Sequence, residues 1–416
     1  MGLPLSLFIF MPFLFVLSTL HLVFTLSSPF MQPLCHHDDS SALLQFKKNF
    51  IIKNSTSVFF LPTCDQKVAS WTVEGDKSDC CSWDGVECDE HTGHVIGLNL
   101  SSNCLFGSIN SNSSLFRLVH LQSLNLSYND FNGSHIPSQV RDLSRLIDLD
   151  LRLSRFVGQI PLEISQLSHL SSLDLSYNYM YSFGHLITLE LKEPILRSLV
   201  ANLTSLQKLD LSYVNMSSTV PNSLANLSSL THLGLRGCGL QGEFPKGIFM
   251  LPNLQHLDVS GNKGLTGYLP SFTWSSPLET LDVGFTSFSG ELPASTGNFS
   301  FLTYLSMWGC NFSRSIPSSL GNLTKLNVLD LSDNYFVGNI PRSLGNLVQL
   351  SSLYISYCQL TGPVPLILGN LVQLFSLDIS NNQLTGPVPL ILGNLVQLSS
   401  LDISNNQLTG PVPLIL

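Results

Sequence analysis

The most constraining feature of the sequence is a 24-residue unit that is repeated almost letter for letter in its C-terminal part. One copy covers residues 347–370, the next covers 371–394, and a third occupies 395–416. A fixed period of this size predicts a solenoid, in which each unit buries its apolar face against its neighbours. The chain should therefore be built by adding turns and not around one globular core.

The spacing Leu-x-x-Leu-x-Leu-x-x-Asn within the unit predicts its local structure. Leu377 and Ile379 alternate like strand residues, so both side chains should point to one face. Asn382 follows where the chain leaves the strand, and an inward amide there can bond the backbone of adjacent turns. Gly386 permits a positive φ at the next bend, and Pro387 should keep the following segment extended.

The same strand and turn recur along most of the chain, which predicts about thirteen turns. The strand leucines or their equivalents are Leu98, Leu124, Leu149, Leu173, Leu209, Leu233, Leu257, Leu281, Leu305, Leu329, Leu353, Leu377 and Leu401. We expect these strands to form one parallel sheet without hairpins. The unit at 173–208 is 12 residues longer than the others, and we expect the excess to be helical structure on the convex side.

The two ends of the chain and its charge narrow the class of protein. Residues 1–28 are largely apolar and predict a secretory signal peptide, although the run is also long enough for an uncleaved membrane anchor. The formal net charge is −9 and there is no cluster of Lys and Arg, which argues against nucleic-acid binding. We divide the rest into an N-terminal cap at 29–94 and repeats at 95–416.

The cysteines fall into two groups. Six lie close to the N-terminus and predict disulfides in a small cap that covers the first repeat: Cys35, Cys64, Cys80, Cys81, Cys88 and Cys104. Asp39 or Ser40 is expected to cap a short helix there, which we favour over a metal site in the string from Cys35 to Asp39. The other three occupy the Asn position of the repeat and are expected to be buried free thiols: Cys238, Cys310 and Cys358.

No catalytic pattern is apparent, because nucleophile-elbow, zincin, P-loop and dinucleotide-binding motifs are absent. One strand position carries a row of carboxylates, which we interpret as repeat consensus with solvated side chains: Asp150, Asp174, Asp210, Asp258, Asp282, Asp330, Asp378 and Asp402. We therefore expect no enzyme activity, no metal and no cofactor.

The segment LTKLNVLDLSDNYFVGNIPRSLGNL at 323–347 resembles the plant-type extracellular leucine-rich repeat. The strings CHHDDSSALLQFKKNF and DCCSWDGVECD resemble the cap of plant receptor-like proteins, including the fungal-resistance class. The resemblance implies an α/β solenoid, right-handed and curved, with a concave parallel sheet. It also implies the bridges Cys35–Cys80 and Cys81–Cys88, which leaves Cys64 with Cys104.

Members of that family are single-pass membrane proteins that signal through partner receptor kinases. This chain departs from the pattern because it has no C-terminal cap, membrane span or tail, so we expect a fragment or a truncated product. Its last turn should expose Leu401, Ile403 and Leu408 and make the isolated chain poorly soluble. The resemblance implies a cell-surface or apoplastic location.

Two sets of surface residues are candidates for function. Sequons predict N-linked glycans at Asn54, Asn112, Asn125, Asn132, Asn202, Asn215, Asn226, Asn298, Asn311 and Asn322. Departures from the repeat on the concave face predict a ligand-binding surface at His232, Arg236, His256, Phe285, Tyr304, Trp308, Tyr354 and Tyr357. Ordinary scatter of surface aromatics remains the alternative for the second set.

The favoured function is recognition of an extracellular peptide or protein by a receptor-like protein in defence or development, with co-receptor kinases as partners. A secreted inhibitor of microbial cell-wall-degrading enzymes is the alternative from a different class, and a non-functional remnant of a receptor locus is a third.

Overall fold

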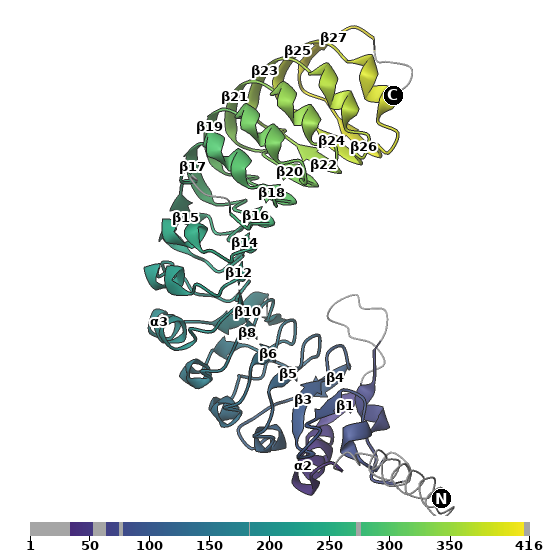
Figure 1. Cartoon of the computed structure of the whole chain (residues 1–416), viewed down its shortest axis with the longest axis vertical. Coiled ribbons are helices and arrows are strands. Elements are labelled where there is room, and N and C mark those ends of the chain that lie inside the picture. The colour runs from purple at the N-terminus through teal and green to yellow at the C-terminus, as the bar shows by residue number, and fades with distance from the viewer. Residues whose placement is uncertain (1–33, 53–63, 75–77, 183, 272–275, 412–416) are drawn as a thin grey trace, which may run out of the picture.

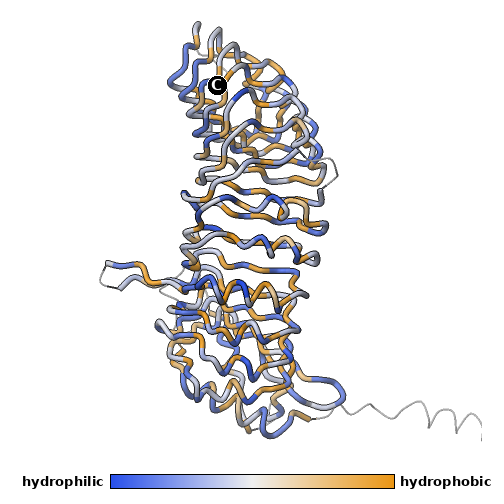
Figure 2. The backbone as a smooth tube through the Cα atoms, turned by 90° about the vertical axis from the view of Figure 1, so that its left-hand side faces the viewer, coloured by the Kyte–Doolittle hydropathy of each residue, from blue (hydrophilic) through white to orange (hydrophobic). Residues whose placement is uncertain are grey.

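The computed structural model describes residues 34–52, 64–74, 78–182, 184–271 and 276–411. The chain forms a crescent of stacked coils (Figure 1). In Figure 2 the coils appear as successive layers, and every layer carries both hydrophobic and hydrophilic stretches. The predicted signal peptide and Asn54 lie outside the described residues. Within the described residues, no helix is both long and apolar enough to cross a bilayer.

The predicted parallel sheet is present and contains the thirteen expected strands. They are β3 (Val95–Asn99), β5 (Ser123–Asn125), β6 (Asp148–Asp150), β8 (Ser172–Asp174), β11 (Lys208–Asp210), β12 (His232–Gly234), β14 (His256–Asp258), β16 (Thr280–Asp282), β18 (Tyr304–Ser306), β20 (Val328–Asp330), β22 (Ser352–Tyr354), β24 (Ser376–Asp378) and β26 (Ser400–Asp402). Equivalent leucines pair, as Leu353 does with Leu377, and both are buried. This sheet lines the inner edge of the crescent (Figure 1).

The expectation of a single sheet was wrong, because a second parallel sheet follows the first. Its strands are β13 (Gln241–Glu243), β15 (Gly264–Gly267), β17 (Ser287–Glu291), β19 (Asn311–Ser315), β21 (Tyr335–Asn339), β23 (Gln359–Pro363), β25 (Gln383–Pro387) and β27 (Gln407–Thr409). The segment after the Asn position is extended, with Gly386 at φ +79° as predicted. An extended backbone beside its own copy in the next turn satisfies its polar groups by pairing, as Thr361 does with Gln383.

The convex side carries short helices, mostly 3-10. In the repeats these are Ser114–Arg117, Ser138–Asp142, Leu162–Gln166, Asn222–Asn226, Lys246–Met250, Ala294–Asn298, Ser318–Asn322, Arg342–Asn346, Leu366–Asn370 and Leu390–Asn394. A proline stands at the N-cap of most of them, as Pro341 does before Arg342. Proline suits this position because its fixed φ is compatible with the helix start and the missing N–H is not needed there.

The long unit differs from the expectation of extra convex helix alone. A hairpin of β9 (Tyr179–Ser182) and β10 (His185–Glu190) protrudes here, and β10 also pairs with β7 (Gly158–Gln159). Leu189 pairs with Gly158, 31 residues earlier, whereas the regular repeat has 24 residues. Seven of the excess residues therefore belong to the hairpin. The remaining excess lengthens the convex helix, which is the α-helix α3 (Glu193–Asn202). The prediction of a parallel sheet without hairpins therefore fails at this unit.

The N-terminal cap packs α2 (His37–Lys47) against the first turns. Leu43 and Phe46 on α2 are fully buried. Two antiparallel pairs join the cap to the repeats: β1 (Phe50–Ile52) with β4 (Leu105–Gly107), and β2 (Val86–Cys88) with β3. The cap also contains 3-10 helices at Lys67–Ser70 and Cys80–Ser82. These contacts cover the apolar end of the first turn.

The expected capping role of Asp39 was wrong. Helix α2 begins after His36, which makes no side-chain cap hydrogen bond. Asp39 is instead 5% exposed, and its Oδ2 accepts a hydrogen bond from Val95 N at 3.0 Å. The same oxygen lies 3.0 Å from His94 Nδ1. Asp39 therefore ties the cap helix to the first strand.

Three disulfides staple the cap, and their pairing confirms the predicted one. The bridges are Cys35–Cys80, Cys64–Cys104 and Cys81–Cys88. The three remaining cysteines are free and buried, which confirms the prediction for Cys238, Cys310 and Cys358.

A ladder of asparagine amides joins turns at the bend that follows six of the thirteen concave strands. Asn334 Nδ2 donates to Met307 O in the preceding turn at 2.8 Å and to Leu331 O in its own turn at 3.0 Å. Asn334 Oδ1 accepts from Phe312 N at 3.0 Å. Asn129, Asn178, Asn262, Asn382 and Asn406 make the same bond to the carbonyl of the preceding turn. The predicted role of the inward amide is thus confirmed.

Where cysteine replaces asparagine in this ladder, its thiol still contacts the carbonyl of the preceding turn. Cys238 Sγ lies 3.1 Å from Leu211 O, and Cys310 Sγ lies 3.2 Å from Val283 O. The thiol is a weaker donor than an amide, so these turns should be joined less tightly.

The apolar core weakens at the final described turn. Leu377, Ile379 and Leu384 are at most 1% exposed, whereas their equivalents Leu401, Ile403 and Leu408 are only partly buried.

We expect Asn334→Ala to lower the free energy of unfolding by about 3 kcal/mol, because it leaves buried backbone groups without partners. Asn334→Cys should cost less, since cysteine serves this position elsewhere in the chain. Urea unfolding followed by circular dichroism measures both. Equal midpoints for wild type and Asn334→Ala would show that the ladder contributes nothing to stability.

We expect the three free thiols of the native protein to resist alkylation at mildly alkaline pH. Burial raises the pKa of Cys358 to about 11 and raises those of Cys238 and Cys310 as well. The thiolate is the reactive form, so a raised pKa leaves little of it. Iodoacetamide labelling read by intact mass should show three additions only after unfolding, and labelling of the native protein would contradict the burial.

Candidate functional site

The concave face has a shallow hollow of 390 Å³ near the middle of the crescent. It is lined by Tyr213, Arg236, Gly237, Ser260, Gly261, Asp282, Gly284, Phe285, Tyr304, Ser306, Trp308 and Asp330. Four of the predicted ligand-binding residues therefore meet at one place: Arg236, Phe285, Tyr304 and Trp308. They come from β12, β16 and β18 and the bends that follow these strands.

Trp308 projects from the sheet because of its place in the repeat. The equivalent residues Ser332 and Ser356 are 5% and 3% exposed, and an indole is far larger than their side chains. Trp308 is 43% exposed and stacks on Phe285, with 5.2 Å between ring centroids and 10° between ring planes. Phe285 has a φ of +54°, at the bend where most turns adopt the left-handed conformation. The two rings form an aromatic wall of the hollow.

Arg236 occupies the same serine position in an earlier turn. Its Nη1 lies 3.8 Å from Asp258 Oδ2 and 3.8 Å from Asp282 Oδ2. Burial, and next the Asp258 carboxylate, raise the pKa of Asp282 to about 6. Arg236 thus partly neutralises two carboxylates on neighbouring strands.

The expectation that the aspartate row is solvated was wrong for several members. Asp174, Asp282 and Asp150 are 1%, 7% and 8% exposed. Many of the row accept a hydrogen bond from the backbone N–H two residues later, as Asp330 Oδ1 does from Ser332 N at 3.0 Å. Neighbouring strands bring like charges together, and burial followed by the Asp174 carboxylate raises the pKa of Asp150 to about 6.

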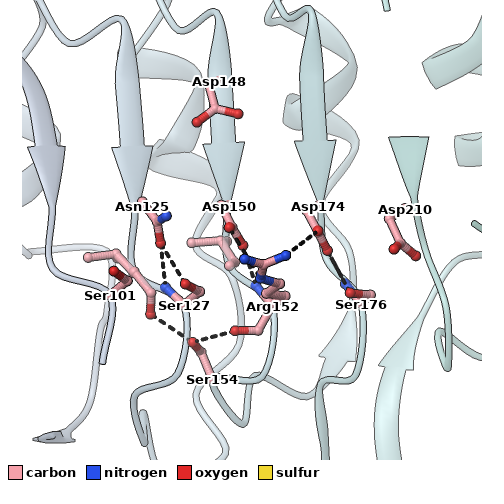
Figure 3. Close-up of polar contacts among 12 residues, drawn as sticks. Ser101, Asn125, Ser127, Asp148, Asp150, Arg152, Ser154, Asp174, Ser176 and Asp210 are labelled. Atoms are coloured by element: carbon pink, nitrogen blue, oxygen red, sulfur yellow. Dashed lines mark hydrogen bonds and ion pairs between the residues drawn. The ribbon is translucent and has the colours of Figure 1, made fainter. Parts of the chain in front are cut away.

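Figure 3 shows how one arginine lies close to two carboxylates of the aspartate row, near the N-terminal end of the sheet. Arg152 lies between Asp150 and Asp174, with its Nε 3.4 Å from Asp150 Oδ2 and its Nη1 3.7 Å from Asp174 Oδ2. Lys208 Nζ is a further partner of Asp174, at 2.8 Å. The guanidinium also lies over the Tyr128 ring, 5.5 Å from its centroid. Arg152, Arg236 and Trp308 all occupy the serine position of their turns.

The other predicted ligand-binding residues do not join this hollow. His232 and His256 contact each other on adjacent strands, with ring centroids 5.5 Å apart. Tyr354 is half-buried on β22. Tyr357 is 62% exposed and lines a separate hollow further along. For these residues, ligand binding stays a prediction.

Of the eight lining residues that were not predicted, three have large or charged side chains: Asp282, Asp330 and Tyr213. Asp282 and Asp330 belong to the aspartate row, and strand alternation alone does not reveal their burial. Tyr213 immediately precedes the Asn position, as Phe285 does, and its ring lies 4.9 Å from that of Tyr177. An aromatic at that position was the signal that could have identified it.

The sequons and one metal-like cluster complete the candidate positions. Among the described sequon residues Asn125 is half-buried on β5, and the others are exposed: Asn112, Asn132, Asn202, Asn215, Asn226, Asn298, Asn311 and Asn322. His36, Asp39 and His94 offer ligand atoms within 4.8 Å of one another. The imidazoles of His36 and His94 are stacked, with centroids 4.3 Å apart, and Asp39 already has its structural bonds. Glycosylation stays a prediction.

Two family models match the chain. The "Leucine rich repeat N-terminal domain" matches residues 36–89. The "Leucine Rich Repeat" matches 120–143, 205–227, 301–323, 325–347, 349–371, 373–395 and 397–416. Both models agree with the cap type and the repeat type that the sequence resembles.

Curated relatives and solved structures agree with these matches. Receptor-like protein 6 of Arabidopsis thaliana is 40% identical over 306 residues, which are 70% of this chain and 30% of the relative. Receptor-like protein 7 of the same plant is 47% identical over 272 residues, 65% of this chain and 26% of the relative. The chain thus spans less than a third of the length of these relatives.

Among solved structures, the plant peptide hormone receptor RGFR1 in complex with RGF2 has a TM-score of 0.65 and 30% identity, over 81% of this chain and 54% of that one. The TDR receptor has a TM-score of 0.61 and 28% identity, over 76% and 60%. With the same cap, the same repeat and this degree of identity, the chain belongs to the plant leucine-rich-repeat receptor-like protein family.

Proposed function

We propose that this chain is the ligand-recognition part of a cell-surface receptor-like protein and that it binds an extracellular peptide or protein without catalysis. The observation that carries the proposal is the exposed pair of Phe285 and Trp308 beside Arg236 in a concave hollow. Aromatic residues and arginine are the types most often found where a few side chains supply most of the binding energy.

The comparisons support a peptide or protein ligand over a small molecule. The similar solved structure of RGFR1 is that of a peptide hormone receptor with its peptide. The hollow described here is open and lies on an extended sheet, whereas sites for small molecules enclose most of the ligand surface. We further propose that the protein acts in defence or development at the plasma membrane, through partner receptor kinases.

The direct test is selection of a random-peptide display library on the secreted, glycosylated chain. We expect peptides to be enriched on wild type and to compete with one another for one site. Failure to enrich any peptide over a solenoid control of the same family would count against a peptide-binding role.

We expect Trp308→Ala to weaken binding of the selected peptides by about tenfold or more, because a large exposed ring that a ligand covers is lost. The side chain is 43% exposed, so its truncation should leave secretion and thermal stability unchanged. Isothermal titration calorimetry measures the affinities.

The matched control is Phe301→Ala. Phe301 is 46% exposed and precedes β18, outside the strand and the hollow. Its removal should leave peptide binding intact. If Trp308→Ala and wild type bind equally well, the aromatic pair is ordinary surface and the site lies elsewhere.

A further inference from the structure

We propose that the hollow accepts a basic side chain of the ligand, an arginine, held between the Trp308 ring and the Asp330 carboxylate. This inference rests on the proposed function and specifies the chemistry of the ligand at the same site. The argument comes from comparing how the chain itself neutralises its row of concave carboxylates.

The first internal example is Arg152. It projects from the serine position after β6 and lies near Asp150 of its own strand and Asp174 of the next, at 3.4 and 3.7 Å. Its guanidinium also lies over the Tyr128 ring. An arginine is thus seated between an aromatic face and two carboxylates of adjacent strands, as its planar, delocalised charge allows.

The second internal example is Arg236, which occupies the same position after β12, three strands further along the sheet than β6. It reaches the next two carboxylates of the row, Asp258 and Asp282, at 3.8 Å each. In both examples the cation is supplied by the chain and extends toward the C-terminal neighbour strand.

The third such position, after β18, carries Trp308. The next carboxylate of the row is Asp330 on β20, and it lines the same hollow as Trp308. Among the described residues, no Lys, Arg or His makes an ion pair with Asp330, and none lowers its pKa. Burial raises the pKa of Asp330. This half-buried carboxylate has no cation of the kind that Arg152 supplies to Asp150 and Asp174 and that Arg236 supplies to Asp258 and Asp282.

The surrounding charges favour a cationic group over an anionic one. Asp282 and Asp330 line the hollow together with Arg236, which is already shared between Asp282 and Asp258. Lys263 lies over the Phe285 ring at 4.4 Å and not beside Asp330. The exposed Asp333 follows in the turn of Asp330. A guanidinium of the ligand stacks on the Trp308 ring and pairs with the Asp330 carboxylate. Arg152 shows the same kind of arrangement within the chain, with Tyr128 as the aromatic ring.

The test compares hexa-arginine, hexa-lysine and hexa-citrulline as probes of the full glycosylated chain by calorimetry at low ionic strength. Citrulline keeps the shape and hydrogen-bonding groups of arginine and lacks its charge. We expect hexa-arginine to bind about tenfold or more tightly than hexa-citrulline, the difference expected for a charge-assisted hydrogen bond. Hexa-lysine should fall between them because it cannot stack as a planar group.

The decisive variants are Asp330→Asn and its matched control Asp402→Asn. Both remove one negative charge from the same strand position, and an asparagine oxygen can still accept the backbone hydrogen bond made by Ser332 or Ser404. Asp402 is exposed in the final described turn, away from the hollow. We expect Asp330→Asn and Trp308→Ala each to weaken hexa-arginine binding by about tenfold, with Asp402→Asn close to wild type.

Equal losses for Asp330→Asn and Asp402→Asn would mean that the probe binds only through the negative net charge, and they would overturn the inference. Absence of hexa-arginine binding, or a preference for hexa-lysine, would overturn it as well. The peptide selection tests the proposed receptor function independently of the arginine site. Selected peptides that need Trp308 but contain no enriched basic residue would leave the receptor role standing without the arginine site.

Discussion

The fold depends on how the sharp bend after each concave strand is satisfied. A chain that turns inside a core buries peptide groups that cannot all reach one another. In the turns that carry asparagine, one side chain solves this, as Asn334 does when it bonds both the carbonyl of the preceding turn and an N–H there. Asn103, in the first turn, is an exception because it makes no such bond to a preceding turn. Its side chain is buried, and neither polar atom has a hydrogen-bond partner among the described residues, because no repeat precedes it.

The ladder also explains why the concave face can vary. The leucines supply the core and the amide satisfies the bend, so the outward strand positions can vary, apart from those whose aspartates accept a backbone hydrogen bond, as Asp330 does from Ser332 N. Trp308 and Arg236 use the one position where the standard residue is a buried serine, so a larger side chain must emerge toward solvent. The hollow therefore forms where large side chains replace the serine of an otherwise regular repeat.

Sequence reasoning predicted the thirteen concave strands because the leucine spacing is set within one turn. It missed the second sheet, because pairing between extended segments depends on how the turns tilt. Thr361 pairs with Gln383, 22 residues on, whereas Leu353 pairs with Leu377, 24 residues on. The hairpin at Tyr179–Ser182 was missed although two runs with strand-like residues flank Gly184, a hairpin signal. For the site, residue types were informative, but burial of the aspartates depends on the neighbouring turns.

The near-identical turns at 347–370 and 371–394 make neighbouring positions in the solenoid interchangeable. Their strands β22, β24 and β26 pair in the same register, leucine to leucine, so each strand could take its neighbour's place without altering the backbone pairing. A recombination event that duplicates or deletes one whole unit would therefore preserve the fold. Gene copies could differ in length on this side of the hollow while the binding surface itself is inherited intact.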